Sequence, residues 1–195
     1  MIHFISDTHW GHTNIIKYSN RPFNSVEEMN EALVKNWNER VQQHDTVYHL
    51  GDFAFTQYDA LKKTARRLNG TKHLILGNHD KAIIQHREDL ISSGTFASIQ
   101  NYVELKHAGE FFVLFHYGQR VWNKSHHGSI HLYGHSHGSL PPFGKSVDVG
   151  VDCKEITGSI KSAADYRPVS VDEVIAYMKK RESVVVDHHG QKDME

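Results

Sequence analysis

The 195-residue sequence has little cysteine, almost no net charge and no long apolar run. Its single cysteine, Cys153, excludes an internal disulfide, so a stapled secreted scaffold is ruled out and a reducing compartment is expected. The 22 basic residues against 23 acidic residues give a charge of −1, which argues against a protein that holds nucleic acid mainly by electrostatics. No apolar stretch approaches the roughly 18 residues of a membrane span, and no leader is visible, so a cytoplasmic protein is expected.

Histidine, in contrast, is abundant, with 17 residues. Neutral imidazole is the commonest metal ligand in proteins, so this count points to a metal site. The composition of 38% hydrophobic and 23% charged residues is that of a globular chain and excludes disorder as the main description. The length predicts a single domain over residues 1–187, followed by a polar tail over residues 188–195.

Hydrophobic periodicity predicts alternating strands and helices in the first half of the chain. Apolar residues recur at spacings of three and four from Val26 to Val41, after a capping box of Ser25 and Glu28, which predicts a helix. Further helices are expected over residues 58–68 and 81–89. In the second half one helix is expected after a capping box at Ser170 and Glu173. Strands are expected over residues 2–6, 45–50, 72–76, 98–105, 111–116, 129–133, 146–151 and 183–186.

Polar clusters follow five of these strands. If the strands lie side by side, their carboxyl ends gather at one edge of the fold, where ligands bind in open α/β proteins. Carboxylates, an amide and imidazoles without a thiolate suit Mn²⁺, Fe or Zn²⁺ better than Ca²⁺. There are too many such groups for one ion, so two ions that share a carboxylate are expected. The candidate ligands are Asp7, His9, Asp52, Asn78, His116, His135 and His137.

The order DxH, GD, GNHD, H and GHxH in these clusters resembles the calcineurin-like metallophosphoesterases. The stretch SDTHWGHTNII at residues 6–16 and the RPF at residues 21–23 resemble small bacterial and phage members. This resemblance implies an α/β (α+β) four-layer sandwich, in which two mixed β-sheets pack together and are flanked by helices. It also implies a ligand set for each ion: Asp7, His9 and His137 for one, Asn78, His116 and His135 for the other, and Asp52 as the bridge.

Two divalent ions, expected to be Mn²⁺ with Fe, Ni or Zn as alternatives, would supply a bound hydroxide that attacks a phosphate ester directly. By the resemblance, His79 binds no metal and acts on the substrate, and we expect it to serve as general acid. Asp80 is expected either to orient His79 or, preferably, to cap the following helix. The motif GDxxDRG of protein phosphatases is absent after Asp52, which disfavours a phosphoprotein substrate.

Candidate substrate contacts are Asn78, His12, Arg21 and Arg120. His12 either faces the phosphate or caps a turn, and Arg21 is either a phosphate clamp or a structural loop residue. Arg120 lies in an aromatic and basic stretch, residues 117–127, which is expected to form a recognition lip or, equally, a polar loop. Because this lip would stack a base, a small nucleotide or nucleic-acid-end phosphodiester is slightly favoured over a monoester. A nuclease acting on polymeric DNA or RNA and a noncatalytic interaction scaffold remain alternatives.

Overall fold

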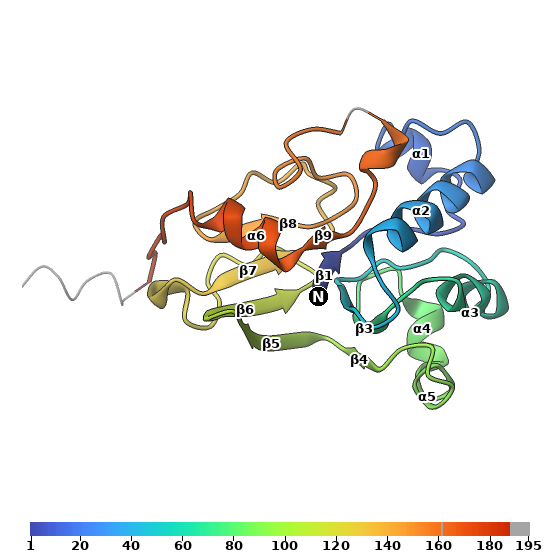
Figure 1. The fold of residues 1–195 in the computed structure, drawn as a ribbon, viewed down its shortest axis with the longest axis horizontal. Helices are drawn as coiled ribbons and strands as arrows, with labels where there is room; N and C mark the ends of the chain where they lie inside the picture. The colour runs from blue at the N-terminus through green and yellow to red at the C-terminus, as the bar shows by residue number, and fades with distance from the viewer. Residues whose placement is uncertain (161, 188–195) are drawn as a thin grey trace, which may run out of the picture.

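Two mixed sheets form the centre of the fold in the computed structural model, which describes residues 1–160 and 162–187 (Figure 1). The predicted tail over residues 188–195 lies outside the described residues. The first sheet has the order β4 (Ser98–Gln100), β3 (Thr71–Ile75), β2 (Thr46–His49), β1 (Ile2–Ile5) and β9 (Val169–Ser170). The second has the order β5 (Tyr102–His107), β6 (Glu110–Phe115), β7 (Ile130–Tyr133) and β8 (Ser146–Asp148).

Parallel pairing brings the carboxyl ends of most strands in both sheets to a common edge. Strands β1 to β4 are parallel to one another, and β6, β7 and β8 are parallel as well. Strands β9 and β5 run antiparallel to β1 and β6, respectively, so each sheet is mixed. Just past the carboxyl end of β1, a parallel bridge from Ser6 to Gly150 joins the two sheets. The loops that follow the parallel strands therefore meet at this junction.

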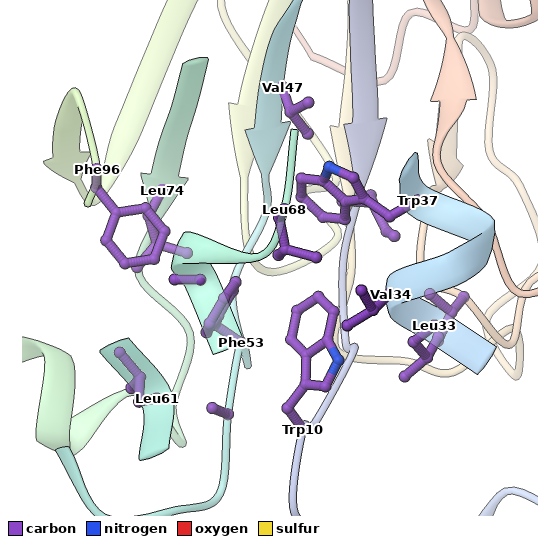
Figure 2. Packing of buried hydrophobic residues seen from close by; sticks show 14 of the residues in the cluster. Trp10, Leu33, Val34, Trp37, Val47, Phe53, Leu61, Leu68, Leu74 and Phe96 are labelled. Carbon is purple, nitrogen blue, oxygen red and sulfur yellow. The ribbon is translucent and has the colours of Figure 1, made fainter. Parts of the chain in front are cut away.

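Apolar side chains fill the space between the sheets and the space under the helices. The ring of Phe4 on β1 lies 5.7 Å from that of Phe112 on β6, within a cluster that also receives Val174 of α6 (Val171–Met178). A second cluster lies under α2 (Val26–Arg40) and α3 (Tyr58–Arg66). Figure 2 shows Trp10 and Trp37 together in this cluster, with ring centroids 6.0 Å apart. The predicted sandwich of two mixed sheets with flanking helices is confirmed.

Two predicted elements are divided in the structure. The strand expected over residues 98–105 is two strands, because Gln100 pairs with Ile75 in the first sheet and Tyr102 pairs with Phe115 in the second. The chain crosses between the sheets at this point. The helix expected over residues 81–89 breaks at His86 into α4 (Lys81–Gln85) and α5 (Arg87–Ser92). A continuous apolar pattern does not reveal either break.

The strand expected over residues 183–186 is wrong. The described residues 179–187 contain no strand, and Val184, Val185 and Val186 remain 40%, 39% and 39% exposed. β-branched residues favour a strand only where a neighbouring strand and a packing surface exist. Short elements were not predicted because they span too few residues to show a period: α1 (Ile15–Tyr18), β9, and two 3₁₀ turns at Ser125–His127 and Ala163–Asp165. Among the described helices, none combines the length and apolarity required to cross a membrane.

The two predicted capping boxes differ in the structure. At α6 the box is complete: the Ser170 hydroxyl accepts the Glu173 amide, and the Glu173 carboxylate accepts the Ser170 amide. At α2 the Ser25 hydroxyl accepts the Glu28 amide as expected, but the Glu28 carboxylate accepts the amide of Asn24 instead. The start of each helix is nevertheless at the predicted residue.

Glu173 also joins α6 to α2, and its charge is expected to matter for stability. Burial alone would raise the pKa of Glu173, but the bonds from Arg167 and Ser170, with Arg40 close by, lower it to about 2. We expect Glu173→Gln to lower the free energy of unfolding by about 1 kcal/mol at pH 7, because glutamine retains the cap but loses the ion pairs. Urea unfolding of both proteins would measure the difference.

The effect of Glu173→Gln should depend on pH in a defined direction. The folded-state pKa of about 2 lies below the ordinary value of 4.5, so the carboxylate stabilises the fold fully above pH 4.5 and progressively less as the pH falls. The difference in the free energy of unfolding between wild type and Glu173→Gln should therefore narrow between pH 7 and about pH 3, with most of the change below pH 4.5. The matched control is Glu39→Gln, whose side chain is 62% exposed and 3.8 Å from Lys35. A difference that is constant with pH would contradict the ion-pair explanation.

Candidate metal centre

Two groups of ligand side chains meet where the loops after the parallel strands converge. Ligand atoms of Asp7, His9 and His137 lie within 4.8 Å of one another, and those of Asp52, His116 and His135 do the same. Asn78 joins the second group, because its Oδ1 lies 3.0 Å from His116 Nε2 and 3.0 Å from His135 Nδ1. The structure thus brings all seven candidate ligands together, in the two sets that the resemblance implies. Their binding of metal stays a prediction.

Asp52 lies between the two groups. Its Oδ2 is 3.7 Å from His9 Nε2 in one group and 3.7 Å from His116 Nε2 in the other. Its Oδ1 accepts the backbone amide of His79 at 2.8 Å. One carboxylate oxygen is therefore anchored by the fold, while the other faces ligands of both groups.

Most of these candidate ligands share an unusual backbone conformation. Among the described residues, five of the candidate ligands have a left-handed backbone, with φ of 57° at Asp7, 51° at His9, 54° at Asp52, 67° at His135 and 48° at His137. Each such residue costs about 1–3 kcal/mol and persists only where its surroundings fix it. Such outliers cluster at functional sites, so the strain is consistent with a site built for a ligand.

Two glycines allow the ligand loops to approach one another. A Cβ on Gly77 would lie 2.5 Å from the backbone nitrogen of Asp52. A Cβ on Gly134 would lie 2.5 Å from Asp7 Oδ2. Any larger residue at either position would push a candidate ligand out of place, and this is the physical reason for glycine before the Asn78 and His135 loops.

Some buried polar atoms of the site have no hydrogen-bond partner. Asp7 is fully buried, and burial raises the pKa of its carboxyl well above the ordinary value, with Asp148 and Asp52 adding to the rise. Asp7 Oδ1 and His9 Nε2 are both buried without a hydrogen-bond partner. Buried polar atoms are normally satisfied, so these atoms need a partner of another kind. A divalent cation held by the oxygen and the imidazole nitrogen would satisfy both, so the residues present fit a metal.

Two of the candidate histidines, His9 and His116, are in the neutral form that binds metal. Burial lowers the pKa of His9 to about 2 and also lowers that of His116, so both imidazoles are neutral at physiological pH. His116 Nδ1 donates to the Leu50 carbonyl at 2.7 Å, which leaves the Nε2 lone pair directed at the site. Cys153 is no competing ligand, because burial raises the pKa of its thiol to about 12.

The structure supports the second of the two roles considered for Arg21, a structural loop residue. Its guanidinium is buried, donates to Asp152 at 2.9 and 2.7 Å, and donates to the carbonyls of Thr8 and Asp7 at 3.0 and 2.6 Å. With its donors used inside the protein, Arg21 is not the predicted phosphate clamp. It supports the first ligand loop from behind.

Asp152 and Asp148 were missed at the sequence level. Asp152 Oδ2 accepts His137 Nδ1 at 2.6 Å, an arrangement that fixes the tautomer of a metal-binding histidine. Asp148 accepts the Ser136 hydroxyl at 2.7 Å and the backbone amides of Gly138 and Gly150 at 2.9 and 2.7 Å. Asp152 directly follows the strand expected over residues 146–151, so the strand-end rule that identified the candidate ligands could have identified it. Asp148 lies inside that expected strand, and only the observed end of β8 at Asp148 places it at the strand end.

Asp80 stands at the predicted N-cap position of α4, but its side chain makes no capping hydrogen bond there. Instead the carboxylate accepts the amides of Asp52, Phe53 and Gly77 at 2.9, 2.9 and 2.8 Å. Burial raises its pKa to about 6, although the three amides act in the opposite direction. Asp80 therefore ties the Asp52 loop to the Gly77 loop, and contact with a reacting atom stays untested for it.

His79 and His12 face the open side of the site. The His79 side chain is 43% exposed, and its Nε2 lies 4.0 Å from Asp52 Oδ2. A cavity of about 560 Å³ is lined by His9, His12, His79 and His137, among others. His79 is thus placed to reach a molecule bound at the ligand groups. Substrate contact by His12 and Asn78 stays a prediction.

Part of the predicted recognition lip, residues 117–127, packs inside the protein and is not available to contact a substrate. Trp122 is buried, and its Nε1 donates to the Ser129 carbonyl at 3.1 Å, so this ring is structural. Arg120 lines a separate cavity of about 190 Å³, with Tyr133 and Phe143 among its neighbours. That cavity shares no lining residue with the His79 cavity. Substrate contact by Arg120 is therefore not supported by a shared cavity and stays a prediction.

Comparison with known proteins gives consistent results. Residues 1–147 match the model of the calcineurin-like phosphoesterase superfamily domain. An uncharacterized protein of Methanocaldococcus jannaschii is 35% identical over 188 residues, covering 92% of each chain. The gene 66 protein of Mycobacterium phage D29 is 29% identical over 160 residues, covering 70% of this chain and 78% of the phage protein. A crystal structure of a protein of unknown function from Aquifex aeolicus superposes with a TM-score of 0.66 at 25% identity, covering 90% of this chain and 98% of that one.

Proposed function

Because this chain belongs to the calcineurin-like phosphoesterase superfamily, we propose that it hydrolyses small phosphodiesters with two divalent metal ions. Family membership supports phosphoester hydrolysis as the activity of the chain. Two divalent ions and a diester substrate are the finer parts of the proposal. The observation that supports them most directly is the position of Asp52 Oδ2, at 3.7 Å from one histidine of each ligand group.

Each group of the site has a role in this proposal. When bound, two divalent ions supply an activated water and neutralise the charge on the phosphoryl oxygens. Asp7, His9 and His137 would hold one ion, Asn78, His116 and His135 the other, and Asp52 both. His79 would donate a proton to the departing ester oxygen, which otherwise leaves as a costly alkoxide. Carboxylate, amide and neutral imidazole donors suit Mn²⁺, with Fe, Ni and Zn as alternatives.

The surroundings of His79 support a diester over a monoester. The cavity of about 560 Å³ is lined by His9 and His137 of the first group, and a second cavity of about 410 Å³ is lined by His79 as well. A phosphodiester carries a substituent on each of two ester oxygens, and both substituents need room. The two cavities provide that room.

The direct test is hydrolysis by protein stripped of metal and reloaded with one metal at a time. We expect bis-p-nitrophenyl phosphate to be hydrolysed after Mn²⁺ is added, with lower rates for p-nitrophenyl phosphate and none in the presence of excess chelator. Metal content measured on the same samples should approach two ions per chain. Strict preference for the monoester would contradict the diester proposal, and a single bound ion at full activity would contradict the two-ion proposal.

The two alternatives give different results in the same assay. A nuclease would hydrolyse polymeric DNA or RNA, and its affinity would fall steeply with salt as phosphate contacts are screened. The net charge of −1 does not favour that behaviour. A noncatalytic scaffold would be folded but would turn over none of these substrates, even with Mn²⁺ added. Turnover by the purified protein that disappears with a site variant excludes the scaffold.

A further inference from the structure

An exposed aromatic ring stands beside His79. Phe55 is 51% exposed, although its backbone amide is anchored to the Trp10 carbonyl at 2.8 Å. Its ring stacks on that of His12 with centroids 4.4 Å apart and 21° between the planes, and it lies 5.8 Å from the His79 ring. About half of the ring remains in contact with solvent, so it contributes less burial to the fold than a core ring would. The position of the ring next to His79 suggests a ligand.

The ring also lies on a defined side of the site. Phe55 lines the cavity of about 410 Å³ together with Thr56, Gln57, His79 and Lys81. His79 lines this cavity and also the larger one that contains His9 and His137. His79 therefore stands between the place where a phosphate would meet the ligand groups and the cavity that contains Phe55. A proton donor in this position faces the departing ester oxygen, so whatever is attached to that oxygen extends toward Phe55.

Building on the proposed function, we propose that Phe55 forms a binding site for a planar aromatic ring on the leaving group, of which a nucleobase is the favoured example. In the reaction, a water oxygen forms the new bond to phosphorus and the bond from phosphorus to the leaving oxygen breaks. His79 passes a proton to that oxygen as it departs. The products are a phosphomonoester and an alcohol that carries the ring, and a proton of the attacking water returns to His79.

This site is different from the lip expected at residues 117–127. Stacking is tolerant of base identity because every base has an aromatic face, so the site selects a class of leaving group rather than one base. Removing the aromatic side chain that stacks on one base commonly weakens binding about tenfold or more. We therefore expect Phe55 to contribute a preference of about tenfold for leaving groups that carry a ring.

Three probes with the same thymidine 3′-phosphate core test this site. They are thymidylyl-(3′→5′)-thymidine, thymidine 3′-(benzyl phosphate) and thymidine 3′-(methyl phosphate), whose leaving alcohols are a nucleoside, a simple alcohol with an aromatic ring and an alcohol without a ring. The measured quantity is the ratio of kcat/KM for each ring-bearing probe to that for the methyl probe, counting only release of thymidine 3′-phosphate. We expect Phe55→Leu to reduce this ratio about tenfold, chiefly through KM, and Phe55→Tyr to retain it. A reduced ratio for the dinucleotide alone identifies a nucleobase, and a reduction for both probes identifies any planar ring.

Controls separate this role from a structural one. Tyr102→Leu removes another exposed ring, 38% exposed and on the second sheet, and should leave the ratio unchanged. Metal content and melting temperature of Phe55→Leu show whether the site itself is intact. An unchanged ratio in a folded, metal-loaded Phe55→Leu protein overturns the inference. If the ratio falls in Tyr18→Leu and not in Phe55→Leu, the inference is overturned as well. Of the two cavities beside His79, Tyr18 lines only the larger one, which does not contain Phe55. If the wild type hydrolyses no diester at all, the proposed function itself fails.

Discussion

Asp52→Asn is expected to abolish phosphoester hydrolysis and to release both metal ions. Asp52 Oδ1 accepts the His79 amide at 2.8 Å, and Oδ2 faces a histidine of each ligand group at 3.7 Å. Asparagine has one oxygen and one NH₂ group. If its oxygen keeps the bond to the His79 amide, the NH₂ group faces the ions. If the oxygen faces the ions, the NH₂ group meets the amide, which is also a donor. Either orientation also removes the negative charge, so one substitution weakens both ion positions.

We expect the rate to fall by about 10³-fold or more and the metal content to approach zero in the same folded sample. Elemental analysis after gel filtration and hydrolysis of bis-p-nitrophenyl phosphate measure the two effects. Asp59→Asn, in the exposed first turn of α3, is the matched control and should change neither. Retention of two ions by Asp52→Asn would show that Asp52 does not bridge them.

The candidate ligands could be predicted from the sequence because of one geometric rule. Side chains that directly follow parallel strands meet at one edge, whatever their separation along the chain. Asp7, Asp52 and Asn78 follow neighbouring strands of the first sheet, and His116 and His135 follow neighbouring strands of the second. The sequence pattern therefore located them without knowledge of the register. It could not say which residues hold the ligands in place.

Those supporting residues depend on contacts that no local pattern encodes. Arg21 is followed by proline in a loop, and only the fold shows that it is buried and paired with Asp152, 131 residues away. Asp80 follows a strand, as the candidate ligands do, yet its carboxylate is buried and accepts three backbone amides. An aspartate at a strand end has the same sequence signature in both roles. Burial and hydrogen-bond partners decide between them, and both are properties of the folded chain.

The errors in secondary structure have a related cause. The pattern over residues 98–105 is a uniform strand pattern, but the pairing partners change between Gln100 and Tyr102. The valine-rich segment 183–186 has strand propensity but, as described, no strand partner. In both places local propensity was read correctly and tertiary pairing determined the outcome.

His79→Ala is expected to keep both metal ions and to lower turnover. The backbone amide of His79, and not its ring, donates to Asp52 at 2.8 Å, so removing the ring leaves the Asp52 carboxylate anchored. The ring itself is 43% exposed on the open side of the site, and its Nε2 is 4.0 Å from Asp52 Oδ2. Loss of a general acid typically lowers the rate about 10²- to 10⁴-fold. Metal content should match that of the wild type.

The size of the loss should depend on the leaving group, and this dependence identifies proton donation. An alkoxide needs a proton as it departs, whereas p-nitrophenoxide is stable without one. His79→Ala should therefore slow hydrolysis of thymidylyl-(3′→5′)-thymidine much more than that of bis-p-nitrophenyl phosphate. The control is His44→Ala, because the His44 side chain is 83% exposed and lies outside both cavities around His79. Equal losses on both substrates would assign His79 to phosphate binding, and loss of metal from His79→Ala would assign it to the metal centre.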